Sequence, residues 1–367
     1  MSRTVALTAL MLAGSAQAAT APEPLTATQM LQQFNVVVTE NSTSTSHVQG
    51  RTYIGGSANG GEYVQLGTGV PTSNYAGLTV RGSANNIKVD NKGAVIGGSL
   101  TANNTTINGD AYVGGSSTDA HYTNGSVWIE GAANNVQFGD LIHAGSYQNI
   151  NLNGKILNEK TSTMQSTLAA STSTNFSSVL TGLSSQLAAL HNTEGASVDF
   201  AKQGKDVTFN FTGTGNVAVF DLTDEYDTRI FSGAVTDFHF NLGTATTVIF
   251  NTDDTTLNLS ANFNNGSGLG SQLIWNFTGT GTAVTIGNTL AGQVLVADGS
   301  FQNNNGNVDG GVYAKTLYQY GEIHQQTFSG TLPAAVPEPE TYAMLVVGLG
   351  LIGLTARRRR KPALALR

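Results

Sequence analysis

One short phrase of apolar, glycine and small residues recurs five times between Thr52 and Ala133. Each copy has a β-branched residue two positions before a glycine and a serine or alanine directly after it; the copies read TYIGGSA, LTVRGSA, AVIGGSL, AYVGGSS and VWIEGAA. The last four copies are 16, 17 and 16 residues apart. A short, nearly fixed period with three constant columns predicts the stacked coils of a β-solenoid. An antiparallel sheet with a recurrent turn phrase is the alternative.

The columns of this repeat predict which side chains face the interior. β-Branched residues suit a pleated inward face, and glycine suits a place where two backbones approach closely. Tyr53, Tyr112 and Trp128 stand three positions before the repeat glycine, so they alternate with the β-branched column. If these rings face outward, they form a candidate ligand face on which sugar rings would stack. If they face inward, they belong to the core.

Asparagine pairs occupy the expected turns between coils, at Asn85-Asn86, Asn103-Asn104 and Asn134-Asn135. Asparagine tolerates left-handed backbone and hydrogen-bonds its own chain. Stacked in successive coils, these side chains would form amide ladders; the alternative is that each is an isolated loop residue.

The apolar period changes from two to 3.6 between residues 158 and 191. Apolar residues separated mostly by three, four or eight positions form one stripe, which comprises Met164, Leu168, Phe176, Val179, Leu180, Leu183, Leu187 and Leu190. This predicts one long amphipathic helix packed along the flank of the β-body. A coiled-coil partner helix is less favoured because charged residues do not flank the stripe. Short strands then resume, and the phrase NFTGTG occurs twice, from Asn210 and from Asn276.

The N-terminus has the three parts of a secretory signal peptide. Arg3 precedes the apolar run VALTALMLA, and Ala16-Gln17-Ala18 forms a small-x-small cleavage site. We therefore expect residues 1–18 to be a signal peptide that is removed after export. A membrane anchor is disfavoured because the run is too short to span a bilayer. Residues 19–29 are expected to be a flexible start, followed by a β-body over residues 30–332.

The C-terminus, residues 333–367, combines a short motif, an apolar run and a basic cluster. The motif is Pro337-Glu338-Pro339, and the apolar run predicts a transmembrane helix at about 341–356. Local thinning of the bilayer and snorkelling arginines would accommodate its short length. The basic cluster would stop transfer and stay cytoplasmic; it consists of Arg357, Arg358, Arg359 and Arg360.

This three-part tail resembles the PEP-CTERM sorting signal of Gram-negative bacteria that make extracellular polysaccharide. The resemblance implies processing near Pro337-Glu338-Pro339 by an exosortase-type membrane protease. It also implies that the protein is anchored in the inner membrane before processing and then moves to the cell surface or the extracellular space.

Charge and cysteine content exclude several classes of function. Charged residues make up 11% of the chain, about half the usual share. The body between the signal peptide and Val336 keeps 10 of the 17 basic and 22 of the 24 acidic residues. This acidic balance argues against a nucleic-acid partner, because phosphate binding needs a basic surface. The absence of cysteine excludes disulfides and thiolate metal sites.

No catalytic motif stands out along the chain, and we expect neither enzymatic activity nor a cofactor. The six histidines lack the HExxH spacing of zinc proteases, and the GxSxG motif of serine hydrolases is absent. Asp253-Asp254 and Asp224-Glu225-x-Asp227 have the hard oxygen ligands that calcium prefers, but they match neither an EF-hand nor the GGxGxD calcium repeat. We interpret them as solvated loops and predict no metal site.

Two long segments resemble the choice-of-anchor A domain, a family named for its occurrence with alternative surface-anchoring signals. They are FNVVVTENSTSTSHVQGRTYIGGSA, from Phe34, and GQVLVADGSFQNNNGNVDGGVYAKTLYQYGEIHQQTFSG, from Gly292. The family is described as adhesin-like, and the resemblance spans nearly the whole body. One departure is Val296-Ala297-Asp298, where an Ala-Pro pair is expected.

Three hypotheses follow. The first is an exported adhesive or structural surface protein of a polysaccharide-rich biofilm. The second is a β-helix enzyme acting on polysaccharide, which needs paired carboxylates, or a carboxylate with Arg or Lys, on one coil face. The third is an ice-binding-like protein, which needs a flat threonine array at the coil period. The repeat column here is serine, and similarity of architecture alone is weak support for a function.

Overall fold

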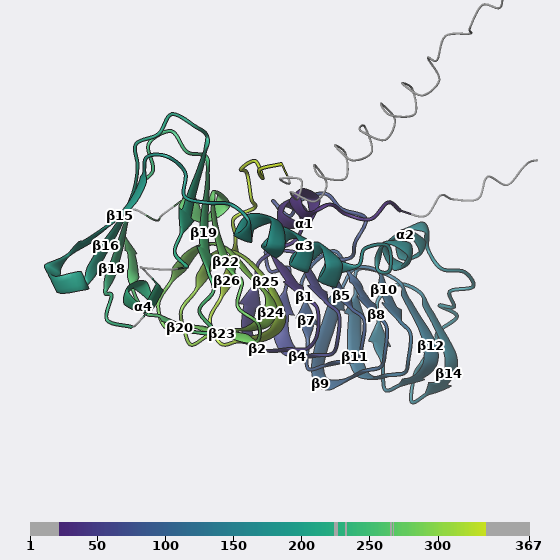
Figure 1. The fold of residues 1–367 in the computed structure, drawn as a ribbon. Helices are drawn as coiled ribbons and strands as arrows, with labels where there is room; N and C mark the ends of the chain where they lie inside the picture. The colour runs from purple at the N-terminus through teal and green to yellow at the C-terminus, as the bar shows by residue number, and fades with distance from the viewer. Residues whose placement is uncertain (1–21, 224–226, 232, 265, 267, 335–367) are drawn as a thin grey trace, which may run out of the picture.

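The structure is a computed structural model that describes residues 22–334 except 224–226, 232, 265 and 267 (Figure 1). The signal peptide, the Pro337-Glu338-Pro339 motif, the apolar run 341–356 and the arginine cluster lie outside the described residues. Within residues 22–334, no helix combines the length and the apolar character needed to cross a membrane.

The N-terminal half of the body consists of a short helix and fourteen strands. They are α1 (Ala27–Gln33), β1 (Val36–Val38), β2 (Ser42–Val48), β3 (Thr52–Ile54), β4 (Ala58–Tyr63), β5 (Leu78–Val80), β6 (Ala84–Asn85), β7 (Lys88–Val89), β8 (Ala94–Ile96), β9 (Leu100–Asn108), β10 (Ala111–Val113), β11 (Ser117–Thr123), β12 (Val127–Asn134), β13 (Gln137–Phe138) and β14 (Ile142–Gln148). Thr26 and Gln29 form a capping box that opens α1, and α1 begins within the segment 19–29.

Three helices and the remaining strands complete the body. They are α2 (Ser162–Ala170), α3 (Phe176–Ala188), β15 (Ala196–Ala201), β16 (Asp206–Phe211), β17 (Val217–Asp221), α4 (Asp227–Ile230), β18 (Asp237–Asn241), β19 (Thr247–Thr252), β20 (Thr256–Leu259), β21 (Asn262–Asn264), β22 (Leu273–Phe277), β23 (Thr282–Ile286), β24 (Leu290–Asn303), β25 (Val308–Gln319) and β26 (Ile323–Gln325). Two short 3₁₀ turns span Lys202–Gly204 and Leu269–Ser271.

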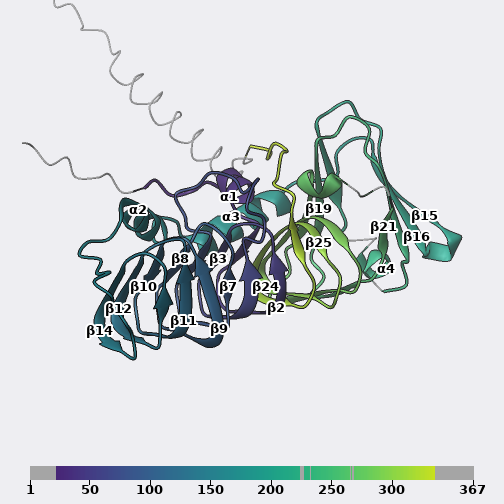
Figure 2. The ribbon, with the colours of Figure 1, turned by 180° about the vertical axis from the view of Figure 1, so that it is seen from behind.

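The β-solenoid prediction is confirmed, because successive copies of the repeat pair in parallel and in register. Tyr53 lies opposite Thr79, and Tyr112 lies opposite Val95 on one side and Trp128 on the other. In the described residues, 22 strands belong to one such network, and β15, β16, β18 and β21 form a separate small sheet at one end (Figure 2). The antiparallel alternative is therefore wrong for the repeat; antiparallel pairing occurs between β15 and β16.

The first coil of the chain lies in the middle of the solenoid rather than at its end (Figure 1). Strand β1 pairs with β3 on one side and with β25, near the C-terminus of the body, on the other. The N-terminal coils stack in order from β1 to β14. The C-terminal coils start at the opposite end of the solenoid and stack towards the first coil, where β25 pairs with β1 and β2. We call the junction of β25 and β26 with β1 and β2 the seam.

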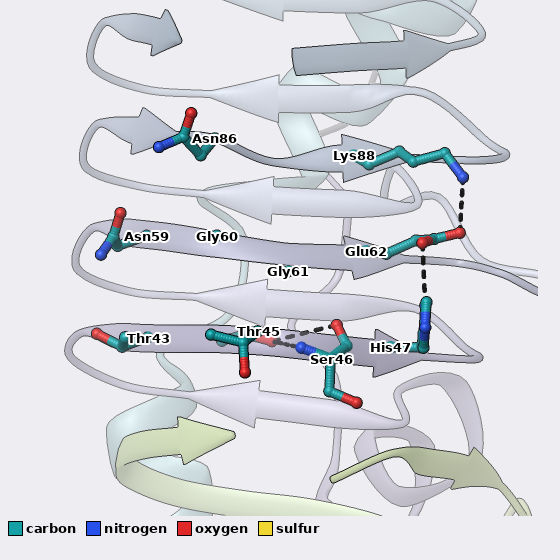
Figure 3. Close-up of a pocket in the computed structure, with 11 residues that line it drawn as sticks. Thr43, Thr45, Ser46, His47, Asn59, Gly60, Gly61, Glu62, Asn86 and Lys88 are labelled. Atoms are coloured by element: carbon teal, nitrogen blue, oxygen red, sulfur yellow. Dashed lines mark hydrogen bonds and ion pairs between the residues drawn. The ribbon is translucent and has the colours of Figure 1, made fainter. Parts of the chain in front are cut away.

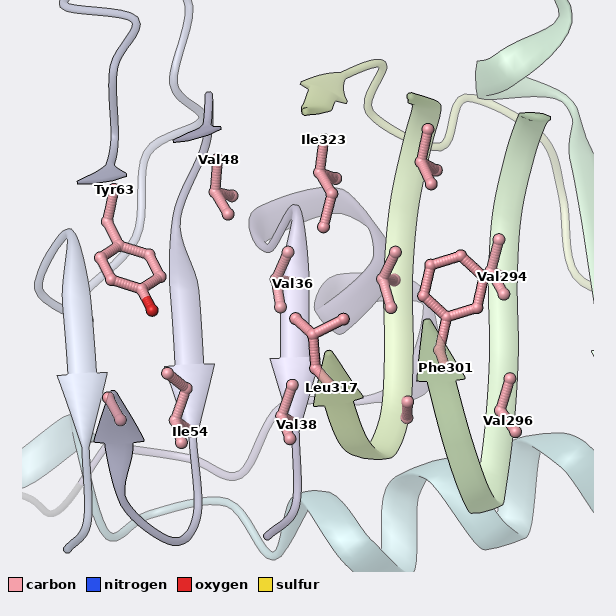
Figure 4. Packing of buried hydrophobic residues seen from close by; sticks show 14 of the residues in the cluster. Val36, Val38, Val48, Ile54, Tyr63, Val294, Val296, Phe301, Leu317 and Ile323 are labelled. Carbon is pink, nitrogen blue, oxygen red and sulfur yellow. The ribbon is translucent and has the colours of Figure 1, made fainter. Parts of the chain in front are cut away.

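The seam is closed by the same apolar packing as the rest of the core. Val36 and Val38 of the first coil are fully buried, and they pair with Val312 and Ala314 of the last coil. Figure 4 shows how β-branched and aromatic side chains from both halves fill one continuous interior. The core therefore does not stop where the chain begins.

The expected single helix over residues 158–191 is wrong: the segment forms two helices, α2 and α3. The hydroxyls of Ser171, Thr172 and Ser173 donate to carbonyls of the last turn of α2 and so compete with its continuation. Asn175 then caps α3 by accepting from the backbone N–H of Ser178 at 3.2 Å. The flank packing is confirmed, because Phe176, Leu180, Leu183 and Leu187 are buried against the β-body.

The glycine and serine columns have one shared cause, a tight corner at which successive coils stack. A methyl group added at Gly82 would lie 2.7 Å from both the Gly56 carbonyl oxygen and the Ser57 hydroxyl of the preceding coil. That hydroxyl accepts a hydrogen bond from the backbone N–H of Ser83 in the next coil, and the pattern continues along the repeat. Glycine leaves room for the hydroxyl, and the serine hydroxyl accepts a hydrogen bond from a backbone N–H group at the corner of the next coil.

Candidate functional site

The aromatic column considered as a candidate ligand face is covered in part by α3 and in part by the segment that precedes α2. Tyr53 is 8% exposed, and its ring centroid is 4.3 Å from that of Phe176 at the start of α3. The ring of Trp128 stacks on His143 at 3.6 Å, and the ammonium group of Lys160 lies 4.1 Å from its centroid. Because a stacked imidazole and an ammonium cannot occupy the same face, both faces of Trp128 are covered.

Tyr112 is half-buried beside Trp128, with the Lys160 ammonium 5.7 Å from its ring centroid. The column thus points away from the coil interior, but two elements cover it: α3 at Tyr53, and the segment that contains Lys160 at Tyr112 and Trp128. Neither an open sugar platform nor a coil-core position describes it. Repeat phase alone could not predict this outcome, because the covering residues come from another part of the chain.

A second outward column, which sequence reasoning did not single out, is exposed or half-buried along a different face of the solenoid. Its members lie three residues after each repeat glycine in the N-terminal half, and the parallel register continues through the seam. Every position bears a hydroxyl or an amide: Asn258, Thr285, Gln302, Tyr318, Thr43, Asn59, Asn85, Thr101, Thr118, Asn134 and Gln148. We call this the polar column.

The polar column contains part of the predicted amide ladder. The Asn85 amide donates to Asn59 at 3.3 Å, and the hydroxyl of Thr101 donates to Asn85 at 3.4 Å. At the next corner, Asn135 donates to Asp119 at 2.5 Å, so asparagines there stack with a carboxylate as well. The side chains of residues 102–104 are not described, and the predicted pair at 103 and 104 is therefore left open.

A hollow of about 480 Å³ opens beside this column, where β2 and β4 bend (Figure 3). The hollow exists because Gly60 and Gly61 adopt positive φ angles of 74° and 96° and contribute no side chain. Its lining is polar and consists of Thr43, Ser44, Thr45, Ser46, His47, Asn59, Gly60, Gly61, Glu62, Asn86 and Lys88. A second hollow of about 560 Å³ shares Thr43 and Asn59 and extends towards Thr101.

An ionic cluster closes one end of the first hollow. Glu62 contacts the Lys88 ammonium at 2.7 Å and His47 Nδ1 at 2.9 Å, and Lys88 also contacts Asp90 at 2.9 Å. Burial raises the pKa of Glu62, but hydrogen bonds from Asp90 and Lys88 outweigh it, and the net shift is downward. Burial and the neighbouring Glu62 raise the pKa of Asp90. Glu62, Lys88 and Asp90 thus place two carboxylates and a lysine together on one coil face, which is the combination that the enzyme hypothesis requires.

This cluster could have been found from the repeat, because Glu62 and Lys88 each lie six residues after a repeat glycine. Among the described residues, no group of three or more metal-ligating side chains has the arrangement needed to hold a metal ion. The carboxylate cluster 224–227 falls partly outside the described residues, so its interpretation is unchanged.

The fold and its exposed columns define a rigid parallel β-solenoid that offers an extended polar contact face. Residues 27–325 match the family model described as "Putative Ice-binding-like adhesive domain", and the chain belongs to this family. Residues 335–360 match the PEP-CTERM protein-sorting motif. The adhesin-like domain and the sorting motif expected from sequence are thus both confirmed, and together they describe an exported surface protein. Searches of curated proteins and of solved structures found no match.

Proposed function

We propose that the mature protein is an adhesive, non-enzymatic component of a polysaccharide-rich extracellular matrix. The observation that supports this most strongly is the polar column, which runs without interruption along the solenoid axis. A rigid array of hydroxyl and amide groups at one spacing, about 4.8 Å between strands, suits many weak contacts to an extended polymer.

The same proposal assigns the C-terminal signal its role in delivery. An exosortase-type protease would cut near Pro337-Glu338-Pro339, after residues 341–356 and the cluster Arg357–Arg360 have held the chain in the inner membrane. The motif match supports this route. The test is fractionation of the native host with and without the protease. We expect an uncleaved membrane form to accumulate without it, and an unchanged location would refute the route.

An enzyme acting on polysaccharide is the competing proposal, and the ionic cluster is where it would reside. The Glu62 and Asp90 carboxyl groups hydrogen-bond each other, and the Lys88 ammonium contacts both. A glycosidase needs the space between its two carboxyl groups for the sugar or for water. We therefore propose that this cluster is structural. Reducing-end release from the host's own exopolysaccharide, lost in Glu62→Gln, would overturn that assignment.

Ice binding is a second candidate because the polar column includes Thr43, Thr101 and Thr118. The neighbouring serine column does not provide a second threonine row, and its hydroxyls accept backbone N–H groups of the next coil. We expect no thermal hysteresis from the purified protein, and its detection would favour ice over polysaccharide.

A further inference from the structure

Two exposed tyrosines stand out on the solenoid surface. Tyr318 and Tyr320 are each 41% exposed, the highest values among the large apolar side chains of the described residues. Within that part of the chain, no aromatic ring stacks on either of them, in contrast to Tyr53 and Trp128. Solvent-exposed aromatic rings of this kind have an apolar face and a polar tip, which suits contact with amphipathic ligands.

The seam places these tyrosines beside the first hollow. Tyr318 is the register partner of Thr43, so the two side chains are neighbours in the polar column. The pairing keeps the same offset from Ser44–Gln319 to Val48–Ile323, which puts Tyr320 opposite Thr45. Thr43 and Thr45 both line the hollow. The two tyrosines therefore lie in the coil next to the strand that supplies Thr43 and Thr45 to the hollow, while neither ring is itself part of the hollow's lining.

The hollow has hydrogen-bonding groups that the described part of the chain leaves unused. The side-chain hydroxyls of Thr43, Thr45 and Ser46 and the amide of Asn86 make no hydrogen bond to other described residues. Figure 3 shows these side chains along the edges of the strands, with Gly60 and Gly61 between them. These three hydroxyl groups and one amide could form hydrogen bonds with a ligand that is rich in hydroxyl groups.

We propose that Tyr318, Tyr320 and the first hollow form a binding subsite for an extended, neutral glycan chain. Sugar rings stack on the two tyrosines, and their hydroxyls bond to Thr43, Thr45 and the asparagines of the polar column. The second hollow shares Thr43 and Asn59, which extends the groove along the axis, across successive coils. This inference rests on the proposed adhesive function and gives it a defined ligand class and location.

The ligand is neutral for electrostatic reasons. The body has 22 acidic and 10 basic residues, so it repels polyanionic glycans at long range. The nearest cation in the hollow, Lys88, is already in contact with both Glu62 and Asp90. An anionic sugar would have to compete with these two carboxylates, whereas a neutral sugar needs no charge partner.

Affinity electrophoresis of the full-length protein in native gels tests the subsite. The gels contain hydroxyethyl cellulose, mixed-linkage β-glucan, galactomannan or dextran, with alginate as the anionic comparison. We expect retardation by at least one neutral glycan and a loss of affinity of about tenfold in Tyr318→Ala and in Tyr320→Ala. Tyr318→Phe and Tyr320→Phe should retain binding, because they keep the stacking face.

Tyr147→Ala provides a matched control, since Tyr147 is 37% exposed on the distant terminal coil. It should bind like the unsubstituted protein, and circular dichroism should show all variants folded. The subsite is wrong if folded Tyr318→Ala and Tyr320→Ala bind as well as the original, if no neutral glycan retards the protein, or if alginate alone does.

Adhesion of host cells separates this inference from the proposed function. If deletion of the protein abolishes adhesion but the two alanine variants restore it fully, the adhesive function stands and the subsite falls. If deletion leaves adhesion and matrix unchanged while the purified protein still binds glycan at the tyrosines, the matrix role fails and the subsite survives.

Discussion

Replacing Asn35 with leucine should weaken the seam, so that the two halves of the solenoid no longer unfold together. Asn35 is 4% exposed and precedes β1. Its side-chain oxygen accepts from the Gly50 N–H at 3.0 Å, and its amide donates to the carbonyls of Gly310 at 2.5 Å and His324 at 3.3 Å. One side chain thus joins the first coil to the coils on both sides of it.

The expected cost follows from the groups that leucine leaves without a partner. Leucine keeps the branched shape of the asparagine side chain but cannot form hydrogen bonds, so the buried Gly50 N–H and Gly310 carbonyl lose this partner. A buried polar group that loses its hydrogen bond costs about 1–3 kcal/mol, and the two groups together give about 2–6 kcal/mol. The third bond, to His324, is longer and part-buried and adds little.

Guanidinium chloride unfolding measures the effect, and the two tryptophans report on different halves. Trp128 lies in β12 of the N-terminal half, and Trp275 is fully buried in β22 of the C-terminal half. With one tryptophan replaced by phenylalanine at a time, Asn35→Leu should lower the midpoint and separate the two fluorescence transitions, because the seam couples the halves.

Asn85→Leu is the matched control. Asn85 also makes two side-chain bonds between coils, but it is exposed, so water replaces what leucine removes. We expect a loss below about 0.5 kcal/mol. Equal losses for Asn35→Leu and Asn85→Leu would refute the reasoning that burial at the seam makes this asparagine critical.

Three further predictions address the corner, the pH dependence and the helix-covered column. Gly98→Ala should destabilise the protein by about 1–3 kcal/mol, because a methyl group there would lie 2.5 Å from the Ser83 hydroxyl. Gly182→Ala in α3 is the control: nothing lies within 4 Å of the added methyl group, so it should stabilise the protein by up to about 1 kcal/mol. Thermal melts measure both changes, and equal shifts would contradict the stacking argument. Burial lowers the pKa of His324, but hydrogen bonds to Glu322 at 2.9 Å and Asp309 at 2.7 Å outweigh it and raise the pKa above its usual value. This contribution to stability is therefore complete below about pH 6.5 and is lost as pH rises through the raised pKa; denaturation midpoints across this range should be flatter in His324→Gln. Trp128→Ala should lower the free energy of unfolding in urea by about 2 kcal/mol, because the contacts with His143 and Lys160 are lost. Its retardation by glycan should stay unchanged. Loss of glycan binding in a folded Trp128→Ala variant would show that Trp128 belongs to the ligand face.

The repeat made the N-terminal coils predictable because each of its columns has a local cause. β-Branched residues fill the interior, glycine permits the corner, and serine satisfies the donor of the next coil. The break between α2 and α3 also had a sequence signal, namely the polar run before Asn175 with its cap preference. The apolar stripe continued across that run and concealed it.

The seam and the tyrosine subsite had no such local signal. Register partners across the seam, such as Ser44 and Gln319, are 275 residues apart in sequence. The C-terminal coils lack the glycine phrase and vary in length, so their phase relative to the first coil cannot be counted from the sequence. Tyr318 and Thr43 therefore become neighbours only through the closure of the fold.

Closure of the seam and binding at the subsite should be thermodynamically linked. The tyrosines belong to the last coil and the hydroxyls of Thr43 and Thr45 to the first, so an open seam divides the site. Apparent affinity then scales with the fraction of molecules in which the seam is closed. Under mild denaturant, Asn35→Leu should lose glycan affinity over the same denaturant range in which its first fluorescence transition occurs. Tyr318→Ala should lose affinity with no change in stability. Glycan should in turn raise the unfolding midpoint of the unsubstituted protein but not that of Tyr318→Ala, because a ligand stabilises only the state that it binds.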